Sequence, residues 1–102
     1  MRYYNGMITE GPTKRMTVVF YGRVQGVGFR YTVCQIAERF MVTGYTRNLP
    51  NGEVKLVAEG NEQELVDFLN GIRNAPIGRY VTKEQVRWTS ATGKYENFGI
   101  SF

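Results

Sequence analysis

Two stretches of this 102-residue chain repeat apolar residues with helical spacing, and strand-like segments separate and flank them. The first repeat contains five residues at i, i+4, i+7, i+8 and i+11: Phe29, Val33, Ile36, Ala37 and Phe40. The second contains four residues at i, i+3, i+4 and i+7: Leu65, Phe68, Leu69 and Ile72. Asn61 and Glu64 precede the second repeat with the spacing of a capping box. Each repeat predicts an amphipathic helix that needs an apolar surface to cover it.

Strand-like segments make up most of the remaining chain. Four of them are rich in β-branched residues or alternate with a period of two: residues 16–21, 45–49, 53–59 and 81–89. A short closing segment alternates as well, at Phe98, Ile100 and Phe102. Pro50-Asn51-Gly52 is a turn sequence, so residues 45–59 are predicted to form a hairpin.

The order of these elements predicts the fold class. It reads βαββαβ with a short extra C-terminal strand, which is the split βαβ order of a ferredoxin-like α+β plait. Both helices must cover the same face of one antiparallel sheet, because only then do their apolar sides share a core. We also expect the strand at 45–49 to lie beside the strand at 16–21.

Residues 1–15 differ from the rest because they show no apolar periodicity and end in Gly11-Pro12 and Lys14-Arg15. We interpret them as a flexible N-terminal extension, with an added edge strand at residues 2–4 as the alternative. Residues 16–102 then form one domain, since a single core typically spans ~100–150 residues.

The residue types that the chain lacks exclude several kinds of catalysis. It has no histidine, one cysteine (Cys34) and one aspartate (Asp67). Histidine triads, His-ligated metals, Cys-rich zinc sites and two-metal carboxylate clusters are therefore excluded, and we expect no metal and no cofactor. No apolar run reaches the ~18–20 residues that cross a bilayer, and the N-terminus lacks a secretory signal. We therefore expect a cytoplasmic protein without a membrane partner.

Positive charge is concentrated in the first half of the predicted domain. The chain carries a net charge of +4, and residues 16–49 contain four arginines against one glutamate. This distribution favours an anionic ligand, with a solvated surface of chance imbalance as the alternative.

A glycine-rich segment at residues 22–30 joins the first strand to the first helix. Backbone N–H groups of such a turn converge on an anion, and a helix N-terminus adds free donors and a positive dipole end. Arg30 lies in the first helical turn, where its guanidinium can bind phosphate oxygens in a bidentate manner. The segment is not a Walker A loop, because it does not end in Gly-Lys-Ser/Thr, and it is not a dinucleotide motif, because Tyr31 occupies the last glycine position. A structural turn with an exposed arginine remains the alternative.

The segment Gly22-Arg23-Val24-Gln25-Gly26-Val27-Gly28-Phe29-Arg30 resembles the signature of the acylphosphatases. A second pattern of that family is also in place: Gly44-Tyr45-Thr46-Arg47-Asn48, then Gly52-x-Val54 and Gly60. The resemblance covers residues 16–102. It implies hydrolysis of acyl phosphates to a carboxylate and inorganic phosphate, which is both product and inhibitor, by a monomer without cofactors.

The resemblance also implies roles for particular residues. Arg30 matches the phosphate-binding arginine, and Asn48 matches the asparagine that orients the attacking water. The amide cradle corresponds to residues 24–28: Val24, Gln25, Gly26, Val27 and Gly28. Phe20 and Thr46 depart from the family pattern, and both flank the predicted site. Tyr31 and Tyr45 are candidates for contact with an acyl group, although packing in the core or at the rim is the favoured interpretation.

Three other functions remain open at this point. One is an acylphosphatase-like domain that acts on carbamoyl phosphate, as in the leading segment of hydrogenase-maturation proteins; the absence of a zinc motif after residue 102 argues against it. A second is a non-catalytic phosphate-binding regulator. A third is an RNA-binding module, but the strand at 53–59 has no aromatic residue and carries two carboxylates, so we expect no nucleic-acid partner.

Overall fold

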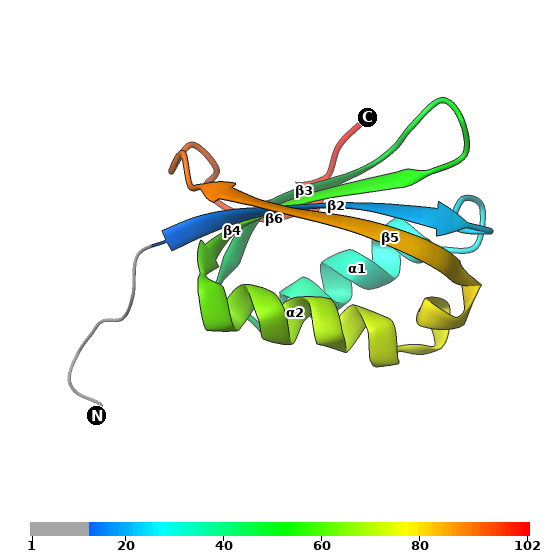
Figure 1. Ribbon diagram of the computed structural model, residues 1–102, viewed down its shortest axis with the longest axis horizontal. Helices are drawn as coiled ribbons and strands as arrows, with labels where there is room; N and C mark the ends of the chain where they lie inside the picture. The colour runs from blue at the N-terminus through cyan, green and yellow to red at the C-terminus, as the bar shows by residue number, and fades with distance from the viewer. Residues whose placement is uncertain (1–12) are drawn as a thin grey trace.

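A computed structural model of the chain describes residues 13–102, which form a five-stranded sheet with two helices on one of its faces (Figure 1). The elements follow the order β2 (Thr13–Gly22), α1 (Phe29–Ala37), β3 (Val42–Asn48), β4 (Val54–Asn61), α2 (Glu62–Asn74), the short 3-10 helix η1 (Pro76–Tyr80), β5 (Val81–Ser90) and β6 (Phe98–Ile100). The predicted ferredoxin-like α+β fold is therefore confirmed. Neither helix within these residues has the length and apolar character that a bilayer crossing needs.

The strands lie in the order β5-β2-β4-β3-β6. The first four are antiparallel to their neighbours, whereas β6 runs parallel to β3, so the sheet is mixed rather than wholly antiparallel. The expectation that the strand at 45–49 lies beside the first strand is wrong, because β4 lies between β2 and β3. The crossover through α1 passes over one strand position, and the hairpin return of β4 fills it.

The first strand begins earlier than the sequence pattern predicts. Thr13 pairs with Asn61 and Arg15 pairs with Glu59, so residues 13–15 belong to β2 and not to an extension. These three residues are polar or charged, so apolar periodicity could not predict this part of the strand. The remaining part of the predicted extension, including the alternative strand at residues 2–4, lies outside the described residues.

The core lies between the sheet and the helices. The strands contribute alternate residues: Met16, Val18 and Phe20 from β2, and Val54, Leu56 and Ala58 from β4. The helices contribute the residues of both predicted repeats, of which all but the half-buried Phe40 are buried. The cap of α2 differs in detail from a capping box, because Asn61 accepts a hydrogen bond from the backbone N–H of Gln63 at 2.9 Å. Glu64 accepts instead from the backbone N–H of Met41 at 2.8 Å.

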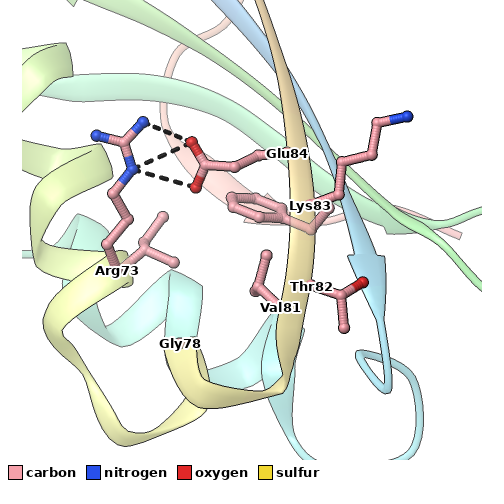
Figure 2. A pocket seen from close by; sticks show the side chains of 8 residues that line it. Arg73, Gly78, Val81, Thr82, Lys83 and Glu84 are labelled. Carbon is pink, nitrogen blue, oxygen red and sulfur yellow. Dashed lines mark hydrogen bonds and ion pairs between the residues drawn. The ribbon is translucent and has the colours of Figure 1, made fainter.

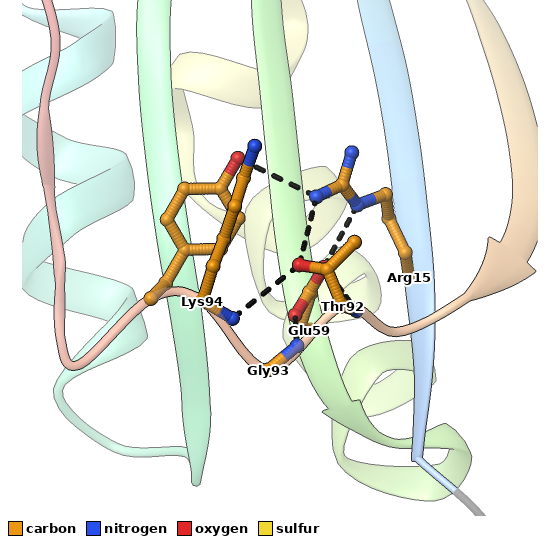
Figure 3. A network of polar contacts seen from close by, with 6 residues as sticks. Arg15, Glu59, Thr92, Gly93 and Lys94 are labelled. Atoms are coloured by element: carbon orange, nitrogen blue, oxygen red, sulfur yellow. Dashed lines mark hydrogen bonds and ion pairs between the residues drawn. The ribbon is translucent and has the colours of Figure 1, made fainter.

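On the opposite face of the sheet, the carboxylate of Glu59 ties the segment between β5 and β6 to the central strand (Figure 3). Its side chain is 4% exposed and accepts hydrogen bonds from Arg15 Nε at 2.8 Å and from the backbone N–H groups of Thr92 and Gly93 at 3.0 and 2.9 Å. Burial by itself raises the pKa of Glu59, but these hydrogen bonds outweigh it and bring the pKa from 4.5 down to about 2. The chain therefore needs this carboxylate charged in order to hold the segment in place.

We predict that this carboxylate makes the fold sensitive to acid. A folded-state pKa of about 2 against 4.5 contributes on the order of 3 kcal/mol, because one pKa unit corresponds to ~1.4 kcal/mol. The contribution is complete above the unfolded-state pKa and is lost as the pH falls from 4.5 towards 2. Urea unfolding at several pH values should show that Glu59→Gln is less stable at neutral pH by on the order of 2–3 kcal/mol and loses less stability in acid.

Glu62→Gln is the matched control, because Glu62 forms an exposed ion pair with Lys14 at 3.3 Å, and such pairs contribute at most about 1 kcal/mol. A Glu59→Gln variant whose stability falls as steeply in acid as that of the wild type would contradict the prediction.

Candidate active site

The segment between β2 and α1 is fastened to the fold at three points. The side chain of Val24 is buried in the core. The backbone N–H of Arg23 donates to the carbonyl of Tyr80 at 3.1 Å. The amide of Gln25 donates to the carbonyls of Leu49 and Glu53, at 2.8 and 2.9 Å, and both belong to the turn between β3 and β4. The loop is thereby held against the end of the β3–β4 hairpin, although β2 and β3 are not neighbours.

Gly26 and Gly28 give the loop its shape. Their φ angles are +77° and +78°, a left-handed conformation that glycine adopts without strain. A Cβ atom added at either position would meet no atom within 4 Å, so the space beside both residues is open. An anion can therefore approach the backbone closely here.

The backbone N–H groups of the loop have no protein acceptors among the described residues. Among residues 13–102, the N–H groups of residues 24–28 take part in no backbone or side-chain hydrogen bond. Gly28 is the N-cap of α1 and has no side chain that could accept a hydrogen bond. The N–H groups of the first helical turn therefore have no side-chain cap either. Free donors at a helix N-terminus favour the binding of a negative charge.

A pocket of about 170 Å³ joins the loop to the end of β3. Its lining residues come from four parts of the chain: Val24, Gly26, Gly28, Phe29, Arg30, Tyr31, Asn48 and Ile100. Within the described residues, Arg30 forms no ion pair and no hydrogen bond, and its guanidinium carbon lies 5.5 Å from the ring centroid of Phe102. The pocket therefore contains a cation whose charge no carboxylate neutralises.

Asn48 contributes a second unsatisfied group. Its Oδ1 atom is buried and has no hydrogen-bond partner, and the same is true of Oγ1 of Thr46, two residues earlier on the same face of β3. A buried oxygen without a partner costs ~1–3 kcal/mol, so a buried amide in this state is suited to a ligand or an ordered water.

Five of the predicted site residues line this pocket, and the other two support the loop without lining it. Val24, Gly26, Gly28, Arg30 and Asn48 line it. Gln25 instead uses its side chain to fasten the loop, and Val27 packs against the core. The structure thus places all of the predicted residues at or next to one site.

The sequence interpretation missed three neighbours of the site, and of its two tyrosine candidates the structure brings only Tyr31 to the pocket. Phe29, Ile100 and Phe102 lie at the pocket or beside Arg30, and Tyr31 lines the pocket with 64% of its surface exposed. Tyr45 lies on the other face of the sheet, where its ring packs 5.8 Å from that of Tyr95. The alternation at Phe98, Ile100 and Phe102 was the only available signal, and it does not reveal that β6 lies beside β3.

The one cysteine of the chain does not supply a nucleophile here. Cys34 is half-buried on α1 and does not line the pocket. Burial raises the pKa of its thiol, although the charge of Arg30 opposes this effect. The thiol therefore stays protonated at neutral pH. Within residues 13–102, no three His, Cys, Asp or Glu side chains gather as a metal site would require.

A second pocket, between α2 and β5, has a different character (Figure 2). One of its two cations, Arg73, donates from Nε to both carboxylate oxygens of Glu84 at 3.1 Å, so its charge is already neutralised. The other, Lys83, extends from β5 on the side away from Glu84 (Figure 2). The unpaired arginine at position 30 therefore marks the better candidate site.

Comparison with known proteins identifies the family of the chain. The family model described as acylphosphatase matches residues 16–100. An acylphosphatase of Caldanaerobacter subterraneus is 39% identical over 79 residues, which is 78% of this chain and 88% of that protein. An acylphosphatase of Methylococcus capsulatus is 39% identical over 87 residues, which is 85% of this chain and 95% of that protein.

Solved structures show the same likeness. The crystal structure of acylphosphatase from Bacillus subtilis has a TM-score of 0.78 and 32% identity, and the match covers 87% of this chain and 99% of that one. Full-length HypF in a phosphate- and nucleotide-bound form has a TM-score of 0.79 and 25% identity, over 96% of this chain but only 13% of that one. The chain therefore belongs to the acylphosphatase family, the enzymes that hydrolyse acyl phosphates.

Proposed function

We propose that the chain hydrolyses acyl phosphates by attack of a water molecule, oriented by Asn48, on a phosphoryl group held by Arg30 and the amides of residues 24–28. One observation carries the proposal: an unpaired guanidinium, free backbone donors and an unsatisfied amide oxygen meet in a single pocket. Each of these groups needs a partner that the described part of the chain does not provide.

An acyl phosphate suits a site with so few reactive groups. Its leaving group is a carboxylate, whose conjugate acid has a pKa of roughly 4–5, so no general acid is required near neutral pH. Of the residues that the structure describes, no carboxylate, lysine or cysteine lines the pocket. Catalysis then depends on positioning and on donors that are already aimed at the phosphoryl oxygens, which supply most of the rate enhancement in phosphoryl transfer.

Each group has a distinct task in this mechanism. Arg30 and the loop amides bind the phosphoryl oxygens and stabilise the charge that spreads over them in the transition state. The amide of Asn48 is both donor and acceptor, so it can hold water in line with the phosphorus. Because no side chain is placed as a base, a phosphate oxygen of the substrate takes the proton from the water.

The rim of the pocket fits the other half of such a substrate. Tyr31, Ile100 and Phe102 are apolar side chains that are 64%, 37% and 99% exposed, and they lie around or beside the cation. A mixed anhydride carries a phosphoryl dianion at one end and an acyl group at the other. The dianion would meet Arg30, and the acyl group would meet these exposed side chains.

Carbamoyl phosphate is the second candidate substrate, because the same pocket would hold its phosphoryl group. It shares the phosphoryl group but replaces the hydrocarbon with an amine. Turnover of acetyl phosphate, benzoyl phosphate and carbamoyl phosphate by the same preparation separates the two proposals. We expect the two carboxylic anhydrides to be hydrolysed faster; a strong preference for carbamoyl phosphate would reverse the order, and no hydrolysis at all would leave a phosphate-binding regulator.

We predict that Arg30→Gln lowers kcat/KM for benzoyl phosphate by on the order of 10³-fold or more, because the variant removes the fixed charge that stabilises the phosphoryl group. Inhibition by inorganic phosphate should weaken as well. Arg39→Gln is the control, since Arg39 is an exposed arginine outside the pocket. Turnover by Arg30→Gln at the wild-type rate would disprove the role of this residue.

We predict that Asn48→Ala lowers kcat by on the order of 10²-fold, because water is no longer held in line, while inhibition by inorganic phosphate changes little. Steady-state kinetics with phosphate as a competitive inhibitor measure both quantities. If phosphate inhibition weakens as much as kcat falls, Asn48 has a structural role rather than the proposed one.

We predict that kcat shows no inflection at about pH 6–7, since the chain has no histidine to titrate there and the pKa of the Cys34 thiol is raised by burial. The measurement is a pH profile of benzoyl phosphate hydrolysis at constant ionic strength. A clear inflection in that range requires a titrating group that this mechanism does not contain.

A further inference from the structure

Lysine and arginine side chains gather on the sheet face that the helices leave uncovered. Val54 and Leu56 of β4 face the core, so Lys55 between them points to the opposite face, where Arg47 of β3 is its direct cross-strand partner. Both helices lie beneath the sheet in Figure 1. We call this uncovered surface the open face and define it by four cations: Arg47, Lys55, Lys83 and Arg87.

The cations of β5 reach the same surface. Lys83 pairs with Tyr21 and Arg87 pairs with Thr17, both of which alternate with the core residues of β2. Figure 2 shows Lys83 extending from β5 on the side away from Glu84. The four cations therefore spread over three strands, across about 14 Å at the usual strand spacing of ~4.8 Å.

None of these four cations has an acidic partner. The ion pairs within residues 13–102 involve other residues: Lys14–Glu62, Arg15–Glu59 and Arg73–Glu84. Arg47 and Lys55 lie directly opposite each other, an arrangement of like charges that destabilises a sheet. Placing such a pair beside the end of the β3–β4 hairpin is understandable if an anion binds there.

Acidic residues are concentrated on the other side of the molecule. Four of them belong to the helices or their ends: Glu38, Glu62, Glu64 and Asp67. On the open face, the carboxylate of Glu59 is buried and already engaged by Arg15, Thr92 and Gly93 (Figure 3). Glu53 alternates with the buried Val54 as Lys55 does, so it is a second carboxylate on this face. Four cations against this one further carboxylate still leave an excess of positive charge, and a field of this kind attracts a polyanion.

The open face also has a hollow and aromatic rings. A depression of about 530 Å³ is lined by Thr17, Val19, Gln85, Val86 and Arg87. The ring of Tyr21 borders the cations at one end, with Nζ of Lys83 at 5.0 Å from its centroid. The packed rings of Tyr45 and Tyr95 border them at the other.

We propose that the open face binds the phosphodiester backbone of a single-stranded nucleic acid, at a site separate from the phosphate loop. Fixed cations on a rigid sheet neutralise several phosphates, and the unstacked bases of a single strand can reach aromatic rings that the paired bases of a duplex cannot. The sequence argued against RNA because residues 53–59 carry two carboxylates and no ring. In the structure one of those carboxylates is neutralised, and neighbouring strands provide the rings.

The test is the salt dependence of binding to a short labelled oligothymidylate or oligouridylate, followed by fluorescence anisotropy. Four phosphate contacts predict a slope of about −3 for log K against log salt, since each contributes ~0.7 on a single strand. Lys55→Gln/Arg87→Gln removes two contacts and should reduce the slope to about −1.4. The plots of log K against log salt for the wild type and this variant should converge near ~1 M salt. At ~50 mM salt the variant should therefore bind on the order of 50-fold more weakly.

Arg39→Gln/Arg79→Gln is the matched control, because it removes the same charge from exposed arginines outside the open face. It should bind as the wild type does, and both double variants should fold and retain benzoyl phosphate hydrolysis. Backbone contacts predict similar affinity for DNA and RNA. A preference for one of them would also support binding at the open face and would show which nucleic acid is the ligand.

Several results would overturn the proposal. These are no binding by the wild type at low salt, equal losses in the two double variants, or displacement of the oligonucleotide by inorganic phosphate, which would place it in the pocket of Arg30. Competition by polyglutamate at equal charge concentration would assign the face to an acidic protein segment instead.

Discussion

The side-chain amide of Gln25 is the contact on which the candidate active site depends most directly. β2 and β3 are separated by β4, so the loop that follows β2 has no backbone pairing with the strand that carries Asn48. Two hydrogen bonds from Gln25, to the carbonyls of Leu49 and Glu53, span that separation. They use the side chain and leave the backbone N–H groups of the loop free. The residue thus shapes the anion site without occupying it.

The fold uses arginine in three different ways, and burial and partners decide which. Arg73 and Arg15 are each neutralised by a carboxylate, and they join elements that are distant in the chain. Arg30 has an aromatic neighbour but no acidic one among the described residues, so its charge remains available. Arg47 also remains unneutralised, beside a lysine on the uncovered side of the sheet. An unpaired cation on a well-packed scaffold indicates a binding site for a ligand, whereas a cation paired with a carboxylate indicates a role in stabilising the fold.

The division of the sheet into two faces separates the two kinds of anion chemistry that we propose. The helix-side face supplies the core, and at its edge the loop, Arg30 and Asn48 form a small pocket of about 170 Å³. The other face presents cations from three strands and a broad depression over β2 and β5. A single phosphoryl group fits the first arrangement, and a repeating chain of phosphates fits the second.

The sequence by itself determined the elements, their order, and most of the residues that line the candidate site. Helical and alternating apolar periods are local properties, and a glycine-rich turn before a helix presents free amides in any fold. Strand order was not accessible in this way, because apolar alternation identifies the buried face of a strand but not its neighbour. For the same reason the sequence placed the strand containing Asn48 beside the first strand, whereas the structure brings Asn48 to the loop through Gln25.

Only the tertiary structure decided which charged and terminal residues contribute to the sheet and to the candidate site. Residues 13–15 read as part of an extension because they are polar, yet Thr13 begins the pairing of β2 with β4, and Arg15 pairs with a glutamate 44 positions away. Because β6 runs parallel to β3, Ile100 reaches the pocket and Phe102 lies beside Arg30. These contacts join residues far apart in the chain, and their energies depend on burial and distance, which exist only once the sheet has formed.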